Sequence, residues 1–248
     1  MTLLALNDVT KRFQDGAKVV SVLEGVSVEI ECGDIVGVYG ERRAGKSTLL
    51  KVMAGYEPPT EGVVSFVGQD LASLSPGGRA RRWRHRGIAL VRGDWRPLRS
   101  GQPAIEYVAI ALTSGGLTLE EAESMARPVL ERVGASAWAH LSTDRLSLNE
   151  RVRVELARAL IGEPRLLLVD EPAVLIDPGE SRELYTLLRS LARELKMALV
   201  IASEDTMAIG GVPRVMTLGD GRLRTTDSRR RVVSLADRRT HGGAPWAS

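Results

Sequence analysis

Residues 35–47 read IVGVYGERRAGKS, an apolar run followed by a loop that closes on Gly45, Lys46 and Ser47. The loop matches the pattern G-x-x-x-x-G-K-[ST], and the residues after it keep the apolar spacing of a helix as far as Gly55. The stretch therefore predicts a buried strand, a tight loop and a helix, in the order that a phosphate-binding loop requires.

Each part of this loop suits a phosphate chain. Its glycines let successive backbone N–H groups curl around phosphate oxygens, and the start of the helix adds partial positive charge. Lys46 supplies a full charge for the β- and γ-phosphates, and the Ser47 hydroxyl is a hard ligand for Mg²⁺. An incidental lysine after a glycine-rich turn is the alternative, which the flanking strand and helix disfavour. The expected phosphate-binding residues are Gly40, Glu41, Arg42, Arg43, Ala44, Gly45, Lys46, Ser47 and Thr48.

Two adjacent carboxylates end a second apolar run, RLLLVDE at residues 165–171. In open α/β sheets ligands bind at the carboxyl ends of the strands, where these acids would lie. We expect Asp170 to join Ser47 in holding Mg²⁺, and Glu171 to polarise the attacking water as a catalytic residue together with Lys46. Solvated loop carboxylates are the alternative interpretation.

The composition is that of an ordinary globular chain. Of 248 residues, 44% are hydrophobic and 26% are charged, which excludes disordered and fibrous classes. A lone cysteine and the lack of a secretory leader predict a cytoplasmic protein. No apolar run approaches the roughly 20 residues of a membrane span, so we expect a peripheral protein that cannot cross a bilayer alone.

Positive charge is concentrated in two segments. Eight arginines and one acid lie between Arg79 and Arg99, and seven arginines and two aspartates lie between Gly221 and Ser248. Neither segment has a nucleic-acid reader motif, so we expect no nucleic-acid partner. They are either solvated faces or contacts for anionic lipid headgroups of the inner leaflet or for a membrane partner.

The rest of the sequence predicts the strands and helices on either side of the loop. Alternation over the first thirty residues predicts short antiparallel strands with turns at Asp15-Gly16 and Glu24-Gly25. Residues 103–162 have helical spacing, including a capping box at Thr118–Glu121. Buried strands return at 166–169 and 197–202, separated by a helix capped by Asp177, and a hairpin follows around Asp220-Gly221. Strands alternating with helices predict a parallel sheet covered on both faces.

With these motifs in place, the chain from Leu4 to Leu223 resembles the ATP-binding subunits of ATP-binding-cassette (ABC) transporters. Residues 146–150, LSLNE, and the helical RVRVELARAL after them stand where the family has its LSGGQ signature. The resemblance implies an α/β P-loop NTPase fold with a mixed RecA-like core sheet, an N-terminal antiparallel β subdomain and an α-helical subdomain. It implies one ATP-binding domain, with core residues 1–92 and 163–227, a helical subdomain at about 93–162 and a basic tail at 228–248.

The resemblance also implies ligands and partners. ATP and Mg²⁺ would be bound, Phe13 would stack on adenine, and Asp177 would reach a dimer interface. Phe13 as a packing aromatic and Asp177 as a helix cap are the structural alternatives. The partners would be a transmembrane permease and a second ABC ATP-binding subunit. The sequence around 55–62, GYEPPTEG, resembles the lipoprotein-release and macrolide-export branch.

Three family positions near the γ-phosphate are altered. Arg92 replaces a glutamine and can pair with phosphate but cannot accept a hydrogen bond from water. Ser147 is retained in the signature, whereas Leu148, Asn149 and Glu150 replace Gly, Gly and Gln; Ser147 and Glu150 form a capping-box pattern, which favours a structural role. Glu204, with Ser203 as second choice, stands at the switch-histidine position.

These departures predict how the subunit works. Losing one transition-state donor typically costs about 10²- to 10³-fold in rate. A homodimer would repeat every defect in both sites, so we expect a slow or partner-dependent ATP hydrolase that forms half of an asymmetric heterodimer. The alternative is a regulatory or structural pseudo-ATPase that closes on ATP without turning it over.

Overall fold

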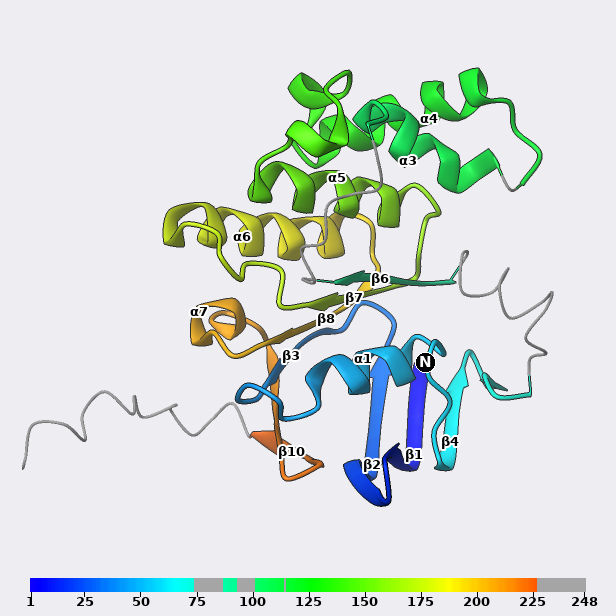
Figure 1. The fold of residues 1–248 in the computed structure, drawn as a ribbon, viewed down its shortest axis with the longest axis vertical. Helices are drawn as coiled ribbons and strands as arrows, with labels where there is room; N and C mark the ends of the chain where they lie inside the picture. Colours follow the sequence, from blue (N-terminus) through cyan, green and yellow to red (C-terminus); the bar gives the residue numbers. More distant parts are fainter. Residues whose placement is uncertain (74–86, 93–100, 114, 227–248) are drawn as a thin grey trace, which may run out of the picture.

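The computed structural model describes residues 1–73, 87–92, 101–113 and 115–226. Two sheets form its framework (Figure 1). The smaller sheet has the strand order β2-β1-β4-β5 and is antiparallel, and the larger has the order β10-β9-β3-β8-β7-β6. In the larger sheet only the β9–β10 pair is antiparallel, as expected for a mixed sheet.

The strands of the smaller sheet are β1 (Thr2–Asp15), β2 (Lys18–Glu31), β4 (Glu61–Phe66) and β5 (Gln69–Asp70). Those of the larger sheet are β3 (Ile35–Tyr39), β6 (Ile88–Arg92), β7 (Leu166–Asp170), β8 (Ala198–Ser203), β9 (Arg214–Gly219) and β10 (Arg222–Thr226).

Helices cover the larger sheet on both faces (Figure 1). The α1 helix lies between the two sheets, whereas α6 lies on the opposite face, with α3, α4 and α5 beyond it. The helices are α1 (Lys46–Met53), α3 (Ala104–Thr113), α4 (Leu119–Arg132), α5 (Leu148–Leu160), α6 (Pro178–Glu194) and α7 (Thr206–Ile209), with 3₁₀ turns at Ser136–Trp138 and Thr143–Arg145.

The central strands show why their sequences are apolar throughout. In β7, Leu166 and Leu168 pack into the core shared with α1, whereas Leu167 and Val169 pack into the core shared with the other helices. A strand that is buried on both faces needs apolar residues at successive positions. The run therefore carries Asp170 to the sheet edge from within the protein interior.

The N-terminal hairpin corrects one expectation. The turn after Asp15 is present, but β1 and β2 are two strands of 14 residues each, not several short ones. The turn expected at Glu24-Gly25 is wrong: β2 continues through Gly25, whose φ of 59° accompanies shifts in the β1–β2 register. A glycine in this conformation bends the strand without ending it.

Other local predictions are confirmed. Thr118 and Glu121 form the capping box of α4, and the Asp177 carboxylate accepts the Gly179 N–H at the start of α6. Most of the arginine-rich segment 79–99 and the tail 228–248 lie outside the described residues. Within the described ranges, no helix combines the length and apolarity needed to cross a membrane.

Candidate functional site

The loop between β3 and α1 depends on its two glycines. A Cβ at Gly40 would lie 2.8 Å from the Leu218 carbonyl oxygen, closer than real Cβ contacts allow. Gly45 has a φ of 101°, and a Cβ there would lie 3.0 Å from the Val22 carbonyl oxygen. The motif glycines therefore let the loop fold tightly against β9 and β2.

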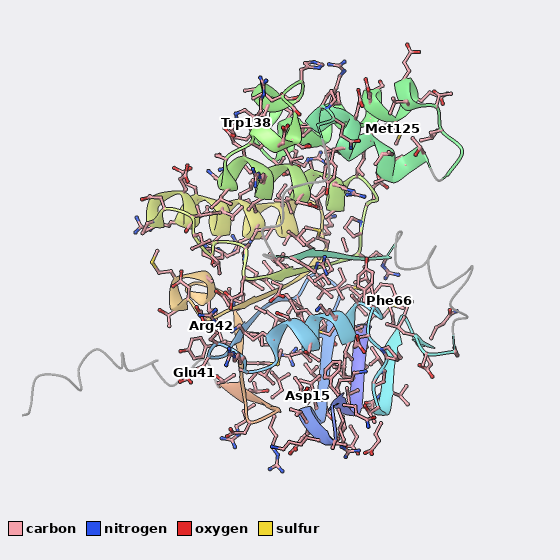
Figure 2. The ribbon with its side chains drawn as sticks, viewed as in Figure 1. Asp15, Glu41, Arg42, Phe66, Met125 and Trp138 are labelled. Atoms are coloured by element: carbon pink, nitrogen blue, oxygen red, sulfur yellow. The ribbon has the colours of Figure 1, made fainter. Side chains whose placement is uncertain are left out.

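The loop leaves the start of α1 open to an anion. Gly45 is the N-cap of this helix and supplies no side-chain cap, and the first turn contains no acidic residue. Residues 41–43 are exposed, and Figure 2 shows Glu41 and Arg42 on the loop. Backbone N–H groups of a helix start without a side-chain acceptor suit phosphate oxygens.

The Lys46 side chain is buried and connects the loop to β7. Its Nζ donates to the carbonyl oxygens of Gly40 at 2.6 Å and Glu41 at 3.0 Å, and lies 2.9 Å from Glu171 Oε1. These three acceptors account for all the N–H donors of the ammonium. A phosphate oxygen that reaches Lys46 must therefore compete with the Glu171 carboxylate.

Asp170 and Ser47 fit a divalent cation. Asp170 is only 8% exposed, and its Oδ1 is buried without a hydrogen-bond partner. Burial raises the pKa of Asp170 above its ordinary value of 3.8, and a hydrogen bond with Ser47 partly opposes this. A carboxylate and a hydroxyl are the hard oxygen ligands that Mg²⁺ takes, with phosphate and water oxygens completing its shell.

The Glu171 carboxylate is held by donors from β8 and the residue after it. Ser203 Oγ donates to Glu171 Oε2 at 2.9 Å, and the Glu204 backbone N–H donates to Glu171 Oε1 at 3.0 Å. Ser203 is 1% exposed, whereas the Glu204 side chain is exposed. Ser203, the second choice for the switch-histidine position, thus contacts Glu171 through its hydroxyl, whereas Glu204 contacts it through the backbone N–H.

A buried tyrosine supports this arrangement from α6. Tyr185 is 2% exposed and hydrogen bonds with Ser203. Burial raises the pKa of Tyr185 to about 12, so its hydroxyl stays neutral at physiological pH. Sequence reasoning missed Tyr185, which its helical spacing marks only as a core position.

Arg92 lies at the same edge of the larger sheet as Asp170, and Phe13 lies on the hairpin that contacts the loop. Arg92 ends β6, and its Cα is the register partner of Asp170 in β7. Phe13 pairs with Val20 in the β1–β2 hairpin, two residues before Val22, which packs on Gly45. Val20 and Val22 are about 7 Å apart along β2 and Phe13 lies across from Val20 on β1, so Phe13 is on the part of the hairpin nearest this contact with the phosphate-binding loop.

Ser147 belongs to a different part of the fold. Its backbone N–H donates to the Glu150 carboxylate at 2.8 Å, and its Oγ accepts from the Glu150 N–H at 3.4 Å, which confirms the predicted capping box. The α5 helix and α1 lie on opposite faces of the larger sheet (Figure 1). Within one chain, Ser147 is therefore separated from the phosphate-binding loop.

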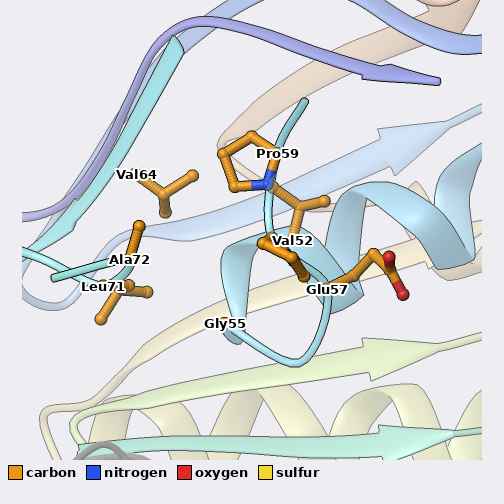
Figure 3. A pocket seen from close by; sticks show the side chains of 8 residues that line it. Val52, Gly55, Glu57, Pro59, Val64, Leu71 and Ala72 are labelled. Carbon is orange, nitrogen blue, oxygen red and sulfur yellow. The ribbon is translucent and has the colours of Figure 1, made fainter. Parts of the chain in front are cut away.

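A small hollow near the C-terminal end of α1 is distinct from this site (Figure 3). Its volume is about 40 Å³, far below the roughly 300 Å³ of the smallest ligand pockets. Its lining is Val52, Gly55, Glu57, Pro58, Pro59, Val64, Leu71 and Ala72. Nucleotide-sized ligands are excluded from it.

Comparisons with known proteins agree with this geometry. The family model described as ABC transporter matches residues 23–174. The lipoprotein-releasing system ATP-binding protein LolD of Shewanella denitrificans is 34% identical over 228 residues, covering 92% of this chain and 97% of that protein. LolD of Chromohalobacter salexigens is 33% identical, covering 89% of this chain and 92% of that protein.

Solved structures show the same architecture. The dimeric structure of MJ0796, a bacterial ABC transporter cassette, has a TM-score of 0.82 and 26% identity, covering 91% of this chain and 98% of that one. A dimeric post-hydrolysis state of the same cassette, bound to ADP and Pi, has a TM-score of 0.81 and 25% identity, with the same coverage. The neighbours therefore include the cassette in two dimeric states.

Proposed function

Because the chain belongs to the ABC transporter family, as an ATP-binding domain similar to LolD proteins, we propose that it drives a membrane-spanning partner through ATP-dependent cassette closure. The observation that carries this proposal is the meeting of Lys46, Asp170 and Glu171 at one edge of the larger sheet. Family members are generally ATP hydrolases, and this arrangement suits ATP hydrolysis.

Each residue of the site has a separate role in binding ATP or in hydrolysing it. Backbone N–H groups of the loop and the first turn of α1 bind the phosphates, and Lys46 pairs with the β- and γ-oxygens. Ser47 and Asp170 would hold Mg²⁺, which would neutralise charge on the phosphates. Glu171, freed from Lys46 when the phosphates take its place, polarises the attacking water. Phe13 stacks on the adenine, and Arg92 pairs with phosphate at the end of β6.

The altered positions support slow turnover in an asymmetric heterodimer. An ordinary enzyme turns over at about 10 s⁻¹, and loss of one donor costs about 10²- to 10³-fold. With Glu204 in place of histidine and Glu150 in the signature, a homodimer would carry both defects at each site. A partner with an intact signature would leave Lys46, Asp170 and Glu171 in one competent site.

The membrane partner is a separate permease of the kind that lipoprotein-releasing systems contain. This assignment is supported by the identity and coverage of the two LolD relatives. The chain would bind peripherally on the cytoplasmic face of the membrane. Its arginine-rich segments at 79–99 and 221–248 would contact inner-leaflet headgroups.

Binding and turnover of the full chain, alone and with its copurified membrane complex, test the proposal. Lys46→Ala should weaken Mg-ATP binding, whereas Glu171→Gln should keep binding and abolish hydrolysis. Unchanged binding in Lys46→Ala would contradict the assigned site. If the complex hydrolyses no ATP and Glu171→Gln changes nothing, the chain acts as a pseudo-ATPase. Robust hydrolysis by the isolated chain would contradict the heterodimer.

A further inference from the structure

Lys11 makes a set of contacts that the phosphate site does not use. Its side chain is 10% exposed, and its Nζ lies 2.6 Å from Glu57 Oε1 and donates to the Pro58 carbonyl oxygen at 2.8 Å. The same ammonium lies 4.9 Å from the centre of the Phe13 ring. Two N–H groups are thus directed to oxygens, and the ammonium also faces the aromatic ring.

A purely structural role explains only part of this arrangement. The neighbouring residues already join β1 to the turn after α1. The Thr60 N–H donates to the Thr10 carbonyl oxygen at 2.8 Å, and the Arg12 N–H donates to Thr60 Oγ1 at 3.0 Å. Arg12 also pairs with Glu61. Lys11 adds an ion pair with Glu57 and a hydrogen bond to Pro58 at the same turn, and it is the residue of this group whose charge also faces the Phe13 ring.

The ring itself is placed to meet a ligand. Phe13 is 37% exposed, although burial of a phenyl side chain away from water is favourable. The hairpin that carries it packs on Gly45 through Val22. An ammonium over one face of the ring leaves the other face for stacking, because the two faces of an aromatic ring are equivalent platforms.

We propose that Lys11, anchored by Glu57 and Pro58, is a positioning residue that fixes the Phe13 ring so that the purine base of the bound nucleotide stacks on it. The inference rests on the proposed function, since it requires a nucleotide on the phosphate-binding loop. Fixing the ring in advance lowers the ordering cost of binding, so the ammonium contributes to base affinity without touching the nucleotide.

Equilibrium binding of ATP, ADP and base-free tripolyphosphate to the full chain, measured by calorimetry with Mg²⁺, tests this role. Lys11→Met keeps the apolar stem and removes the charge, and should weaken ATP and ADP binding by about 3- to 10-fold. Tripolyphosphate binding should stay unchanged, because it uses only the loop and α1. Lys11→Arg keeps the positive charge and should retain most of the wild-type ATP affinity.

Three further variants separate positioning from folding. Arg12→Met, which removes the neighbouring charge on the same strand, should leave ATP affinity unchanged. In a Phe13→Ala background, Lys11→Met should have no further effect, because the ring through which it acts is gone. Glu57→Gln, which only weakens the anchor, should produce a smaller loss in the same direction and serves if Lys11→Met does not fold.

The outcomes distinguish the inference from its premise. If wild-type protein binds ATP and Lys11→Met binds it equally well, the positioning role is wrong while the proposed function stands. The same follows if Lys11→Met loses tripolyphosphate affinity as much as ATP affinity. If wild-type protein binds neither ATP nor tripolyphosphate, the proposed function itself fails and this inference fails with it.

Discussion

The Glu171 carboxylate is held by one ammonium and two neutral donors. Because Ser203 and the Glu204 N–H both reach it, the orientation of this carboxylate depends on residue 203 through its side chain and on residue 204 through its backbone. Glu171 has a φ of 47°, which is uncommon for a non-glycine residue, so the surrounding contacts must maintain its conformation. These two positions should therefore respond differently to substitution.

We expect Ser203→Ala to lower kcat of the membrane complex by about 10- to 100-fold, because the carboxylate that we propose to polarise water loses its orienting donor. KM should change little, since the phosphate contacts remain. Ser203→Thr keeps the hydroxyl and should keep most of the activity. Glu204→Ala keeps the N–H and is the matched control; a larger loss in Glu204→Ala than in Ser203→Ala would show that the Glu204 side chain is the functional group.

Asp170 gives a prediction for stability against pH. Its pKa is raised in the folded protein, so the folded state binds more protons than the unfolded state as pH rises above 3.8, and stability falls over that window. Asp170→Asn should therefore stabilise the metal-free protein at pH 7, by about 2–4 °C in Tm for each kcal/mol regained. The gain should shrink toward pH 4. Thermal unfolding without Mg²⁺ or nucleotide measures it, and a gain that grows toward acid pH would contradict the assignment.

The starts of α4 and α5 are held by the same capping pattern. Ser147 and Glu150 satisfy each other's backbone N–H groups at the start of α5, as Thr118 and Glu121 do at the start of α4. A reciprocal cap of this kind needs only a hydroxyl and a carboxylate or amide three residues apart. The cap therefore requires a side chain at position 150 that accepts a hydrogen bond, but it does not require a negative charge there.

This gives a test with two readouts. Ser147→Ala should destabilise the protein by about 1 kcal/mol, the usual cost of losing a cap, measured by urea denaturation. Glu150→Gln keeps the capping box while removing a charge from the signature, so stability should hold and ATPase activity with the partner should rise. If Glu150→Gln loses stability and gains no activity, the prediction is wrong and the negative charge of Glu150 itself stabilises α5.

Considered as a whole, the molecule separates two of the parts that the proposed nucleotide site needs. The phosphate-binding loop lies on one side of the larger sheet, and Ser147 belongs to the helical part on the other. Under the proposed function, a second cassette would bring its own residues at the Ser147 position to close the site. The solved dimeric cassettes that this fold resembles make such a pairing geometrically reasonable.

The composition of the dimer is measurable. Glu171→Gln protein with Mg-ATP should remain monomeric alone and form a stable dimer only with a cassette whose signature is intact, because Glu150 adds repulsion beside phosphate in the homodimer. Size-exclusion chromatography with light scattering distinguishes the two. A stable homodimer of Glu171→Gln with ATP would contradict the asymmetric arrangement.

Much of the fold and of the candidate site was predictable where the interacting residues are close together in the sequence. The loop at 40–47, the acids after the apolar run 166–169, and both capping boxes are contiguous patterns, so residue order suffices to predict their place on strand, loop or helix. For the capping boxes it also predicts the hydrogen bonds. Glu24-Gly25 shows the limit. The same glycine is compatible with a turn or with a bulge, and its conformation depends on pairing with β1.

The residue order alone therefore determined the glycine-bounded loop between strand and helix, the acidic strand end and the helix caps, because neighbouring residues satisfy those requirements. Contacts between distant segments came from folding. Ser203 reaches Glu171 because β7 and β8 are adjacent in register, and Lys11 reaches Glu57 because β1 packs beside the turn after α1. Side-chain direction at a strand end is set by the neighbouring strands, and no local pattern encodes which strands those are.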